Sequence, residues 1–189
     1  TAQLPSPDLE FLFSKFKHVY IMASIDDINV RNEYIRYPTT WKQTKEFIQW
    51  CEDSPDNISI ESYVTVQNLN IYYIPDIQDW WFNQNFKKIN RDNGGIVHTD
   101  ICHLPERNSN RILPLKAKKM VREKFERWFE NLEYRCPSND SMVIENSKWA
   151  LERFKLILDD MDQDQPISPT LNKSNEEHYT DFMRWTTTQ

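Results

Sequence analysis

Residues 18–25 read HVYIMASI, a nearly unbroken apolar run with a serine next to its end, and Asp26 and Asp27 follow it. A run of this length suits a strand that is buried on both faces, as in a parallel sheet. Two further segments, 58–66 and 96–102, have strand periodicity, with residues of one kind at every second position. Helical segments separate the three. This order predicts an α/β fold with three parallel strands.

Helix signals lie between these strands. Thr40 and Gln43 form a capping-box pattern, which marks the beginning of a helix. The helix that they open is expected to carry one buried face, made of Trp41, Thr44, Ile48 and Cys51. Pro75 suits the first turn of a second helix, which carries the doublet Trp80-Trp81.

The pattern changes after residue 105, where helical periodicity replaces alternation. Three helices are predicted there, beginning at Pro114, at Asn139 or Asp140, and at about Glu176. We therefore expect two parts, an α/β part over residues 1–105 and a helical extension over residues 106–189. Three parallel strands leave both edges of a sheet open, so the sheet is expected to depend on further strands.

Composition excludes several classes of protein. The 189 residues include 7 Trp, 8 Tyr and 10 Phe, enough aromatic residues to build a core. A net charge of -6 argues against nucleic-acid binding, and no apolar run has the length that crosses a membrane. The 3 Cys are widely spaced and odd in number, which favours a reducing, cytoplasmic setting. With only 2 Gly there is no glycine-rich phosphate-binding loop.

One string of residues carries a family resemblance. Residues 23–26 (ASID), followed by residues 32–36 (NEYIR), resemble a stretch of radical S-adenosylmethionine enzymes, most closely the branch with SPASM or twitch extensions. In that family a strand ends in a Ser-x-Asp triplet and a Tyr-x-Arg follows on the next helix turn. Weaker similarity continues along the chain at Thr65-Val66, Asn70-Ile71, His103-Leu104-Pro105, residues 116–119 and residues 181–184.

The resemblance implies a fold and a cofactor site. The family fold is a partial (β/α)6 barrel, so residues 1–105 would be its C-terminal half, and residues 106–189 a twitch-like extension. Sites in such barrels gather at the C-terminal ends of the strands. The family holds the amino-acid end of S-adenosylmethionine with a serine and an arginine, which here correspond to Ser24 and Arg36. Asp26 is a third candidate, with an N-terminal helix cap as its alternative.

The chemistry of these residue types fits that assignment. Arginine offers planar, always charged, bidentate donors to a carboxylate, and a hydroxyl donates or accepts beside it. Taken singly, a serine at the end of a strand is usually a turn or cap residue, and an arginine on a helix is usually a surface charge. The complete string favours the cofactor site.

The implied activity needs residues that this sequence does not contain. Radical S-adenosylmethionine enzymes use a [4Fe–4S] cluster to cleave the cofactor reductively, and the resulting 5′-deoxyadenosyl radical abstracts a hydrogen atom from a substrate. The C-x3-C-x2-C motif that binds the cluster is absent. We therefore expect the cluster ligands in a missing N-terminal half, and we expect the 189-residue piece to be inactive alone. The resemblance also implies an external electron donor and a peptide or small-molecule substrate.

Two alternatives remain. Cys102 and Cys136 either serve an auxiliary cluster or are small buried apolar residues, and the second is commoner, so we assign no metal ligand. The chain is either half of an enzyme or a non-enzymatic α/β interaction module that uses its aromatic helices and acidic tail.

Overall fold

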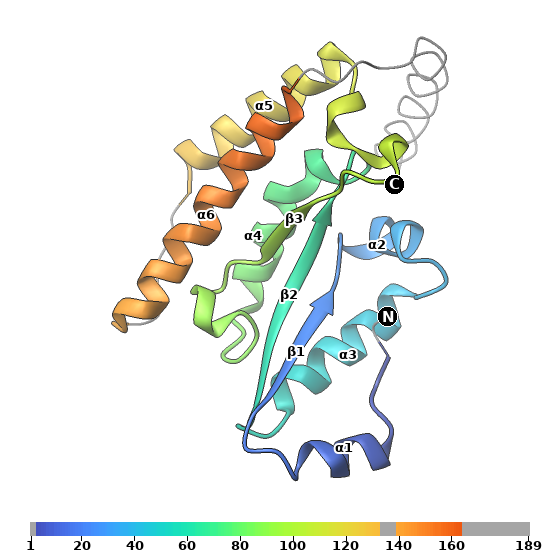
Figure 1. Cartoon of the computed structure of the whole chain (residues 1–189), viewed down its shortest axis with the longest axis vertical. Helices are drawn as coiled ribbons and strands as arrows, with labels where there is room; N and C mark the ends of the chain where they lie inside the picture. The colour runs from blue at the N-terminus through green and yellow to red at the C-terminus, as the bar shows by residue number, and fades with distance from the viewer. Residues whose placement is uncertain (1–2, 133–138, 164–189) are drawn as a thin grey trace.

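The computed structural model describes residues 3–132 and 139–163 of the chain. Within them, three strands form one parallel sheet in the order β1 (Val19–Ser24), β2 (Ile58–Val66) and β3 (His98–Ile101) (Figure 1). The predicted α/β class and the three predicted strands are confirmed. The described sheet is open, so its assignment to a barrel stays a proposal.

Helices connect and follow the strands. In chain order the helices and short 3-10 turns of the described residues are α1 (Pro7–Phe13), α2 (Asn29–Ile35), α3 (Trp41–Asp53), η1 (Ile71–Tyr73), α4 (Ile74–Gln84), η2 (Arg91–Asn93), η3 (Glu106–Asn108), η4 (Asn110–Ile112), α5 (Leu115–Glu130) and α6 (Ser141–Met161). The helix predicted from Glu176 lies outside the described residues, as does Cys136. No described helix has both the length and the apolar character that a membrane crossing needs.

The connection from β1 to β2 and the connection from β2 to β3 both lead to the next strand on the same side of the sheet. Parallel crossovers are almost always right-handed, so two successive steps in one direction put both connecting helices on the same face. Figure 1 shows α3 and α4 behind the strands. The strand side chains that point toward these helices are mainly apolar and belong to the core, including Ala23, Ile60, Val64 and Val66.

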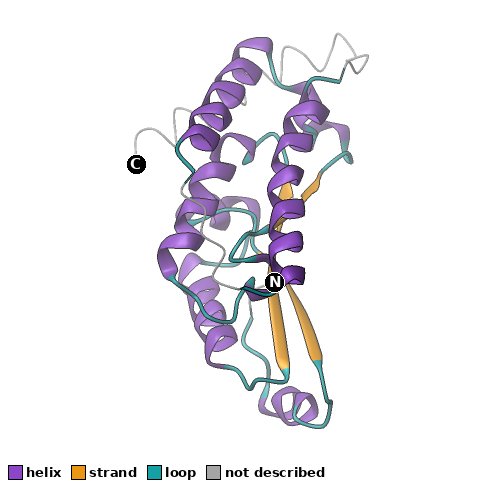
Figure 2. Ribbon diagram, turned by 90° about the vertical axis from the view of Figure 1, so that its left-hand side faces the viewer, coloured by secondary structure: helices purple, strands orange, loops and turns teal. Residues whose placement is uncertain are grey.

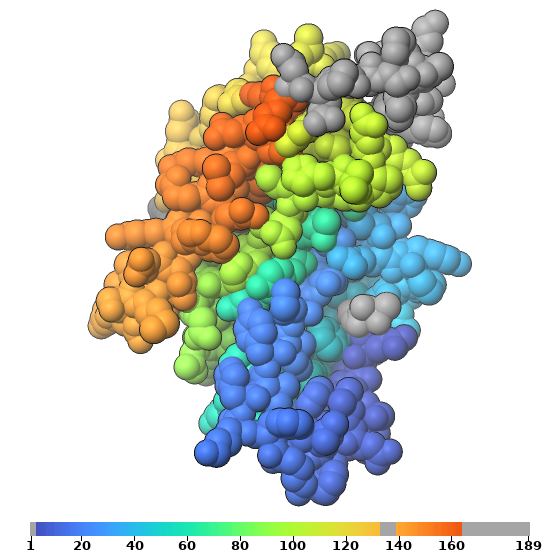
Figure 3. All heavy atoms as spheres, in the orientation of Figure 1, coloured from blue at the N-terminus to red at the C-terminus, as the bar shows by residue number. Residues whose placement is uncertain are grey.

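The other face of the sheet is polar and partly open. Its side chains come from alternate positions of the three strands and include Tyr20, Met22, Ser24, Glu61, Tyr63, His98 and Asp100. We call it the polar face. Figure 2 shows strands at one border of the lower half of the molecule with helices on their other side, and Figure 3 shows side chains of β1 at the surface. The expectation that residues 18–25 are buried on both faces is therefore wrong.

The long helices share the core of the sheet. Buried residues of α5 and α6, among them Val121, Phe125 and Phe154, belong to the same apolar cluster as those of the strands and α3. The core thus continues across residue 105, where two parts were predicted to meet.

Candidate functional site

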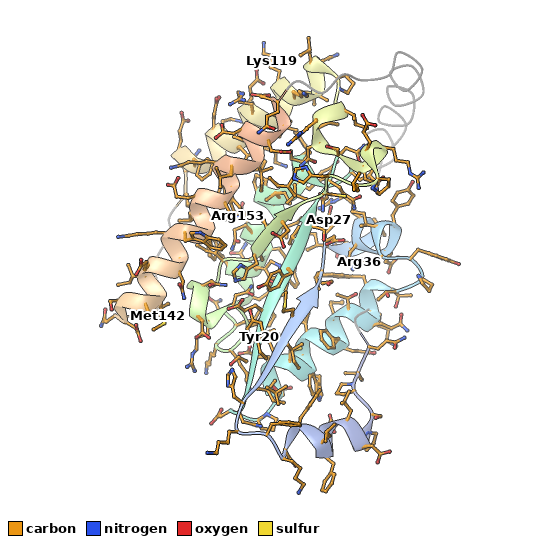
Figure 4. The ribbon with its side chains drawn as sticks, in the orientation of Figure 1. Tyr20, Asp27, Arg36, Lys119, Met142 and Arg153 are labelled. Atoms are coloured by element: carbon orange, nitrogen blue, oxygen red, sulfur yellow. The ribbon has the colours of Figure 1, made fainter. Side chains whose placement is uncertain are left out.

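The site residues predicted from the sequence meet at one edge of the sheet. Ser24 is the last residue of β1, Asp26 follows it, and Arg36 is the C-cap of α2. The carboxyl ends of parallel strands face the same edge, so Thr65 near the end of β2 lies beside them. Figure 4 shows Arg36 just beyond the arrowhead of β1.

Asp26 and Arg36 form a two-point ion pair. Arg36 Nη2 donates to Asp26 Oδ1 at 2.9 Å, and Arg36 Nε lies 2.6 Å from Oδ2. Oδ1 also accepts the backbone N–H of Thr65 at 2.8 Å, and Asp26 is only 3 % exposed. The alternative of Asp26 as a helix cap is wrong, because the N-cap of α2 is Ile28 and no side chain caps it. Asp26 instead fixes the orientation of the guanidinium.

The loop that carries Asp26 is held in place by Asn70. Its side-chain amide donates to Asp26 O at 2.8 Å and to Thr65 O at 3.0 Å. Asn70 is fully buried, and its side-chain oxygen accepts from Gln67 N at 2.8 Å. The asparagine therefore joins the loops that follow β1 and β2, which explains in physical terms why an asparagine follows β2.

Ser24 and Arg36 line a common hollow. Its volume is about 250 Å³, and its walls are Ser24, Asn32, Ile35, Arg36, Tyr37, Thr39 and Thr44. A guanidinium has five N–H donors, and Asp26 is reached by Nε and Nη2. The described part of the chain offers Nη1 no partner. A hydroxyl and an oriented cation thus border one small polar space.

Asp27 is a second carboxylate at this edge, and the sequence analysis did not select it. Its Oδ1 accepts from Ile28 N at 2.7 Å and from Arg31 Nε at 3.0 Å, and its Oδ2 has no partner among the described residues. Burial, only partly offset by Arg31, raises the pKa of Asp27 to about 6. The guanidinium of Arg31 lies 4.0 Å from the ring centroid of Tyr73. The available signal was the Asp-Asp doublet directly after the strand.

A separate cluster occupies the middle of the polar face, and it too was missed. Tyr20 OH donates to Glu61 Oε2, and His98 Nε2 lies 2.6 Å from the same oxygen. The hydroxyls of Tyr20 and Tyr63 are 3.3 Å apart, and the rings of Tyr63 and His98 stack with centroids 4.6 Å apart. We call Tyr20, Glu61, Tyr63 and His98 the face cluster. Its signal was the polar residues at the alternate positions 59, 61 and 63, next to apolar residues at 58, 60 and 64.

The two cysteines of the described residues do not form a metal site. Cys51 is buried in the core, where burial raises the pKa of its thiol to about 12, and Cys102 donates to Leu104 O at 3.3 Å. The described residues contain no group of three or more His, Cys, Asp or Glu side chains that could hold a metal ion. They therefore do not fit a [4Fe–4S] cluster.

Comparison of the chain with protein-family models, with curated proteins and with solved structures finds no match.

Proposed function

We propose that this chain is the C-terminal half of a radical S-adenosylmethionine enzyme and that Ser24 and Arg36 bind the amino-acid end of the cofactor. The observation that carries the proposal is the shared hollow. Two residues 12 positions apart in the sequence (36 − 24) line the same space of about 250 Å³ at the carboxyl edge of a parallel sheet. That edge is where α/β folds bind their ligands.

The residues of the hollow suit an amino-acid carboxylate. Nη1 of Arg36 and the hydroxyl of Ser24 supply donors to its oxygens, and charge-assisted hydrogen bonds of this kind are the strong ones. Asp26 acts as a positioning residue because its carboxylate accepts a hydrogen bond from Nη2 and lies in ion-pair contact with Nε. The hollow is too small for the whole cofactor, so the adenosine would extend beyond it.

The sheet supports the barrel part of the proposal. Its strands are in sequential order, with both connecting helices on one face, which is the arrangement of a singly wound barrel. The polar face would then line the interior, and the free edge of β1 would pair with strands of the first half. Residues 106–163 would be part of the extension.

S-adenosylmethionine, when bound to a reduced cluster, supplies a 5′-deoxyadenosyl radical that abstracts a hydrogen atom from a peptide or small-molecule substrate. In the proposal, a C-x3-C-x2-C segment encoded upstream holds that cluster, and an external donor reduces it. The residues of this chain contribute cofactor binding and orientation.

The first experiment extends the chain. Sequencing upstream of Thr1 should show C-x3-C-x2-C in the same reading frame, and the longer protein, reconstituted with iron and sulfide without oxygen, should produce 5′-deoxyadenosine on reduction. A reconstituted protein with no iron–sulfur absorbance and no 5′-deoxyadenosine would exclude the enzyme.

The second experiment changes Arg36 to Lys in that longer protein. Lysine keeps the charge but loses the planar donors, so S-adenosylmethionine affinity should fall by about 1.5–3 kcal/mol, or roughly tenfold to a hundredfold. Arg31→Lys is the matched control, because Arg31 also pairs with a buried aspartate of the same loop but does not line the hollow. Equal affinity in wild type and Arg36→Lys would return Arg36 to a structural role.

One observation favours the second candidate, an interaction module. α1 has no buried residue, and several large apolar side chains around it and on β1 are exposed: Leu4, Leu9, Phe11, Leu12, Phe16 and Met22. Three of them, Leu4, Leu9 and Met22, line an apolar hollow of about 390 Å³ beside β1. Under the enzyme proposal this surface faces the first half of the same protein. Retention of a stable monomer by the isolated chain, without the upstream half, would favour the interaction module.

A further inference from the structure

The polar face carries a second site that does not involve the cofactor hollow. At its centre is Glu61, which is 7 % exposed. Burial by itself would raise the pKa of Glu61, yet its contacts with His98 and Tyr20 lower that pKa below its ordinary value. Glu61 is therefore ionised at neutral pH and acts only as a hydrogen-bond acceptor.

The charge of Glu61 fixes the tautomer of His98. The contact of 2.6 Å between His98 Nε2 and Glu61 Oε2 requires a proton on Nε2, because an ionised carboxylate donates none. A neutral imidazole has one N–H, so Nδ1 then carries a lone pair. The described residues supply no hydrogen-bond partner for Nδ1. The pair thus has the arrangement in which a carboxylate orients a histidine base.

Two aromatic rings contact the imidazole of His98. Tyr63 stacks on it at an interplanar angle of 9°, and Trp149 of α6 approaches with a centroid distance of 5.9 Å. Trp149 is 54 % exposed, and the side chain of His98 is 16 % exposed. The imidazole of His98 is therefore restrained by its neighbours but still accessible to solvent. These rings offer a flat apolar surface beside a proton acceptor.

The charged side chains of Arg153 and Asp100 lie beside these aromatic rings. Arg153 of α6 donates to Thr99 O and to Asp100 Oδ1, both at 3.1 Å, and its guanidinium lies 5.5 Å from the ring centroid of Trp149. Figure 4 labels Arg153 on α6 and Tyr20, a member of the face cluster, on β1. The site is thus assembled from β1, β2, β3 and α6.

We propose that Glu61 and His98 form a proton-accepting dyad for a polar molecule bound on the polar face. The molecule presents an O–H, N–H or S–H group to Nδ1 and a flat apolar group to the rings. The proton passes to Nδ1, the electron pair of the broken bond stays on the heteroatom, and Glu61 stabilises the imidazolium. No oxidant or reductant is needed, and the inference stands without the cofactor proposal.

The first test is the tautomer of His98 in the 189-residue chain. Long-range ¹H–¹⁵N NMR of the histidine side chains, assigned with His98→Gln, should show that the neutral form of the ring carries its proton on Nε2 and none on Nδ1. In Glu61→Gln this preference should weaken, because an amide can also donate. A proton on Nδ1 in the wild type would overturn the proposal.

The second test is chemical access to Nδ1. Diethyl pyrocarbonate acylates unprotonated imidazole nitrogen, and mass spectrometry locates the modified residue. His98 should be acylated, and Glu61→Gln should lower its rate roughly threefold because the base weakens without the carboxylate. His18 serves as the internal control, since it is exposed and its side chain contacts Ser59 and not Glu61. Acylation of His18 with none at His98 would also overturn the proposal, and neither test involves S-adenosylmethionine.

Discussion

At the scale of single residues, the end of β1 pairs two consecutive carboxylates with two arginines of one short segment. Asp26 forms an ion pair with Arg36, and Asp27 forms one with Arg31. Each pair includes a contact of 3.0 Å or less. Consecutive side chains of an extended segment point in opposite directions, so the two carboxylates reach different partners. One pair borders the hollow, and the other is enclosed.

The enclosed pair gives a prediction about pH. The pKa of Asp27 is about 6 in the folded protein, above the ordinary aspartate value of 3.8, so the folded state binds its proton more tightly than the unfolded state does. Stability from this group is therefore present at low pH and is lost as the pH rises from about 4 through 6. Asp27→Asn resembles the protonated form at every pH. Relative to wild type, it should gain about 2–3 kcal/mol between pH 4 and pH 7.

Urea unfolding of both proteins across this range measures the effect. Other carboxylates titrate alike in the two proteins, so the difference between them isolates Asp27. A difference that stays constant from pH 4 to pH 7 would show that Asp27 has an ordinary pKa.

The two ion pairs also show which contacts of single residues can be predicted from the sequence and which cannot. The string from Ser24 to Arg36 predicts that the two residues share a site, and the structure brings both to one hollow. It does not predict the partner of Asp26, because a local pattern cannot separate a helix cap from a bond to a residue ten positions away. Glu61 and His98 were missed for the same reason, since their contact crosses 37 positions (98 − 61).

At the scale of elements, α3 shows how a local signal fixes a helix. Thr40 Oγ1 accepts from Gln43 N at 3.2 Å, and Gln43 Oε1 accepts from Thr40 N at 2.9 Å. This reciprocal pair satisfies two backbone donors that a helix N-terminus leaves free. The predicted buried face, Trp41, Thr44, Ile48 and Cys51, is also confirmed.

The capping box can be tested by substitution. Thr40→Ala removes the acceptor for Gln43 N and should lower the free energy of unfolding by about 1 kcal/mol. Thr40→Ser keeps a hydroxyl at the same position, so its free energy of unfolding should fall by less than half as much as that of Thr40→Ala. Urea denaturation monitored by circular dichroism gives both values, and an Ala variant as stable as the Ser variant would show that the cap contributes nothing.

Element faces are harder to predict than element positions. The beginnings and ends of β1 and α3 follow from local patterns, yet the prediction that β1 is buried on both faces is wrong. The run of residues 18–25 shows which residues are apolar, but whether a helix covers them depends on the rest of the fold. Tyr20 and Met22 are therefore exposed on the described chain.

At the scale of the whole molecule, the long helices and the sheet share one core. Phe154 of α6 is fully buried, and its ring lies 5.5 Å from that of Trp128 on α5. Both residues belong to the apolar cluster that includes Val66 of β2 and Ile77 of α4. A core that continues from the strands into α6 predicts that residues on either side of position 105 unfold together.

Phe154→Ala tests this coupling. Removal of a fully buried ring leaves a cavity and should cost about 3–5 kcal/mol. Leu156→Ala is the control on the same helix, because Leu156 is 48 % exposed and should change stability by no more than about 0.5 kcal/mol. If the core is shared, Phe154→Ala should lower the unfolding midpoint of the sheet and of α6 equally. Hydrogen exchange, measured separately for the amides of β2 and of α6, gives the stability of the sheet and of the helix. Loss of protection in α6 with β2 unchanged would show instead that residues 106–163 fold as a separate unit.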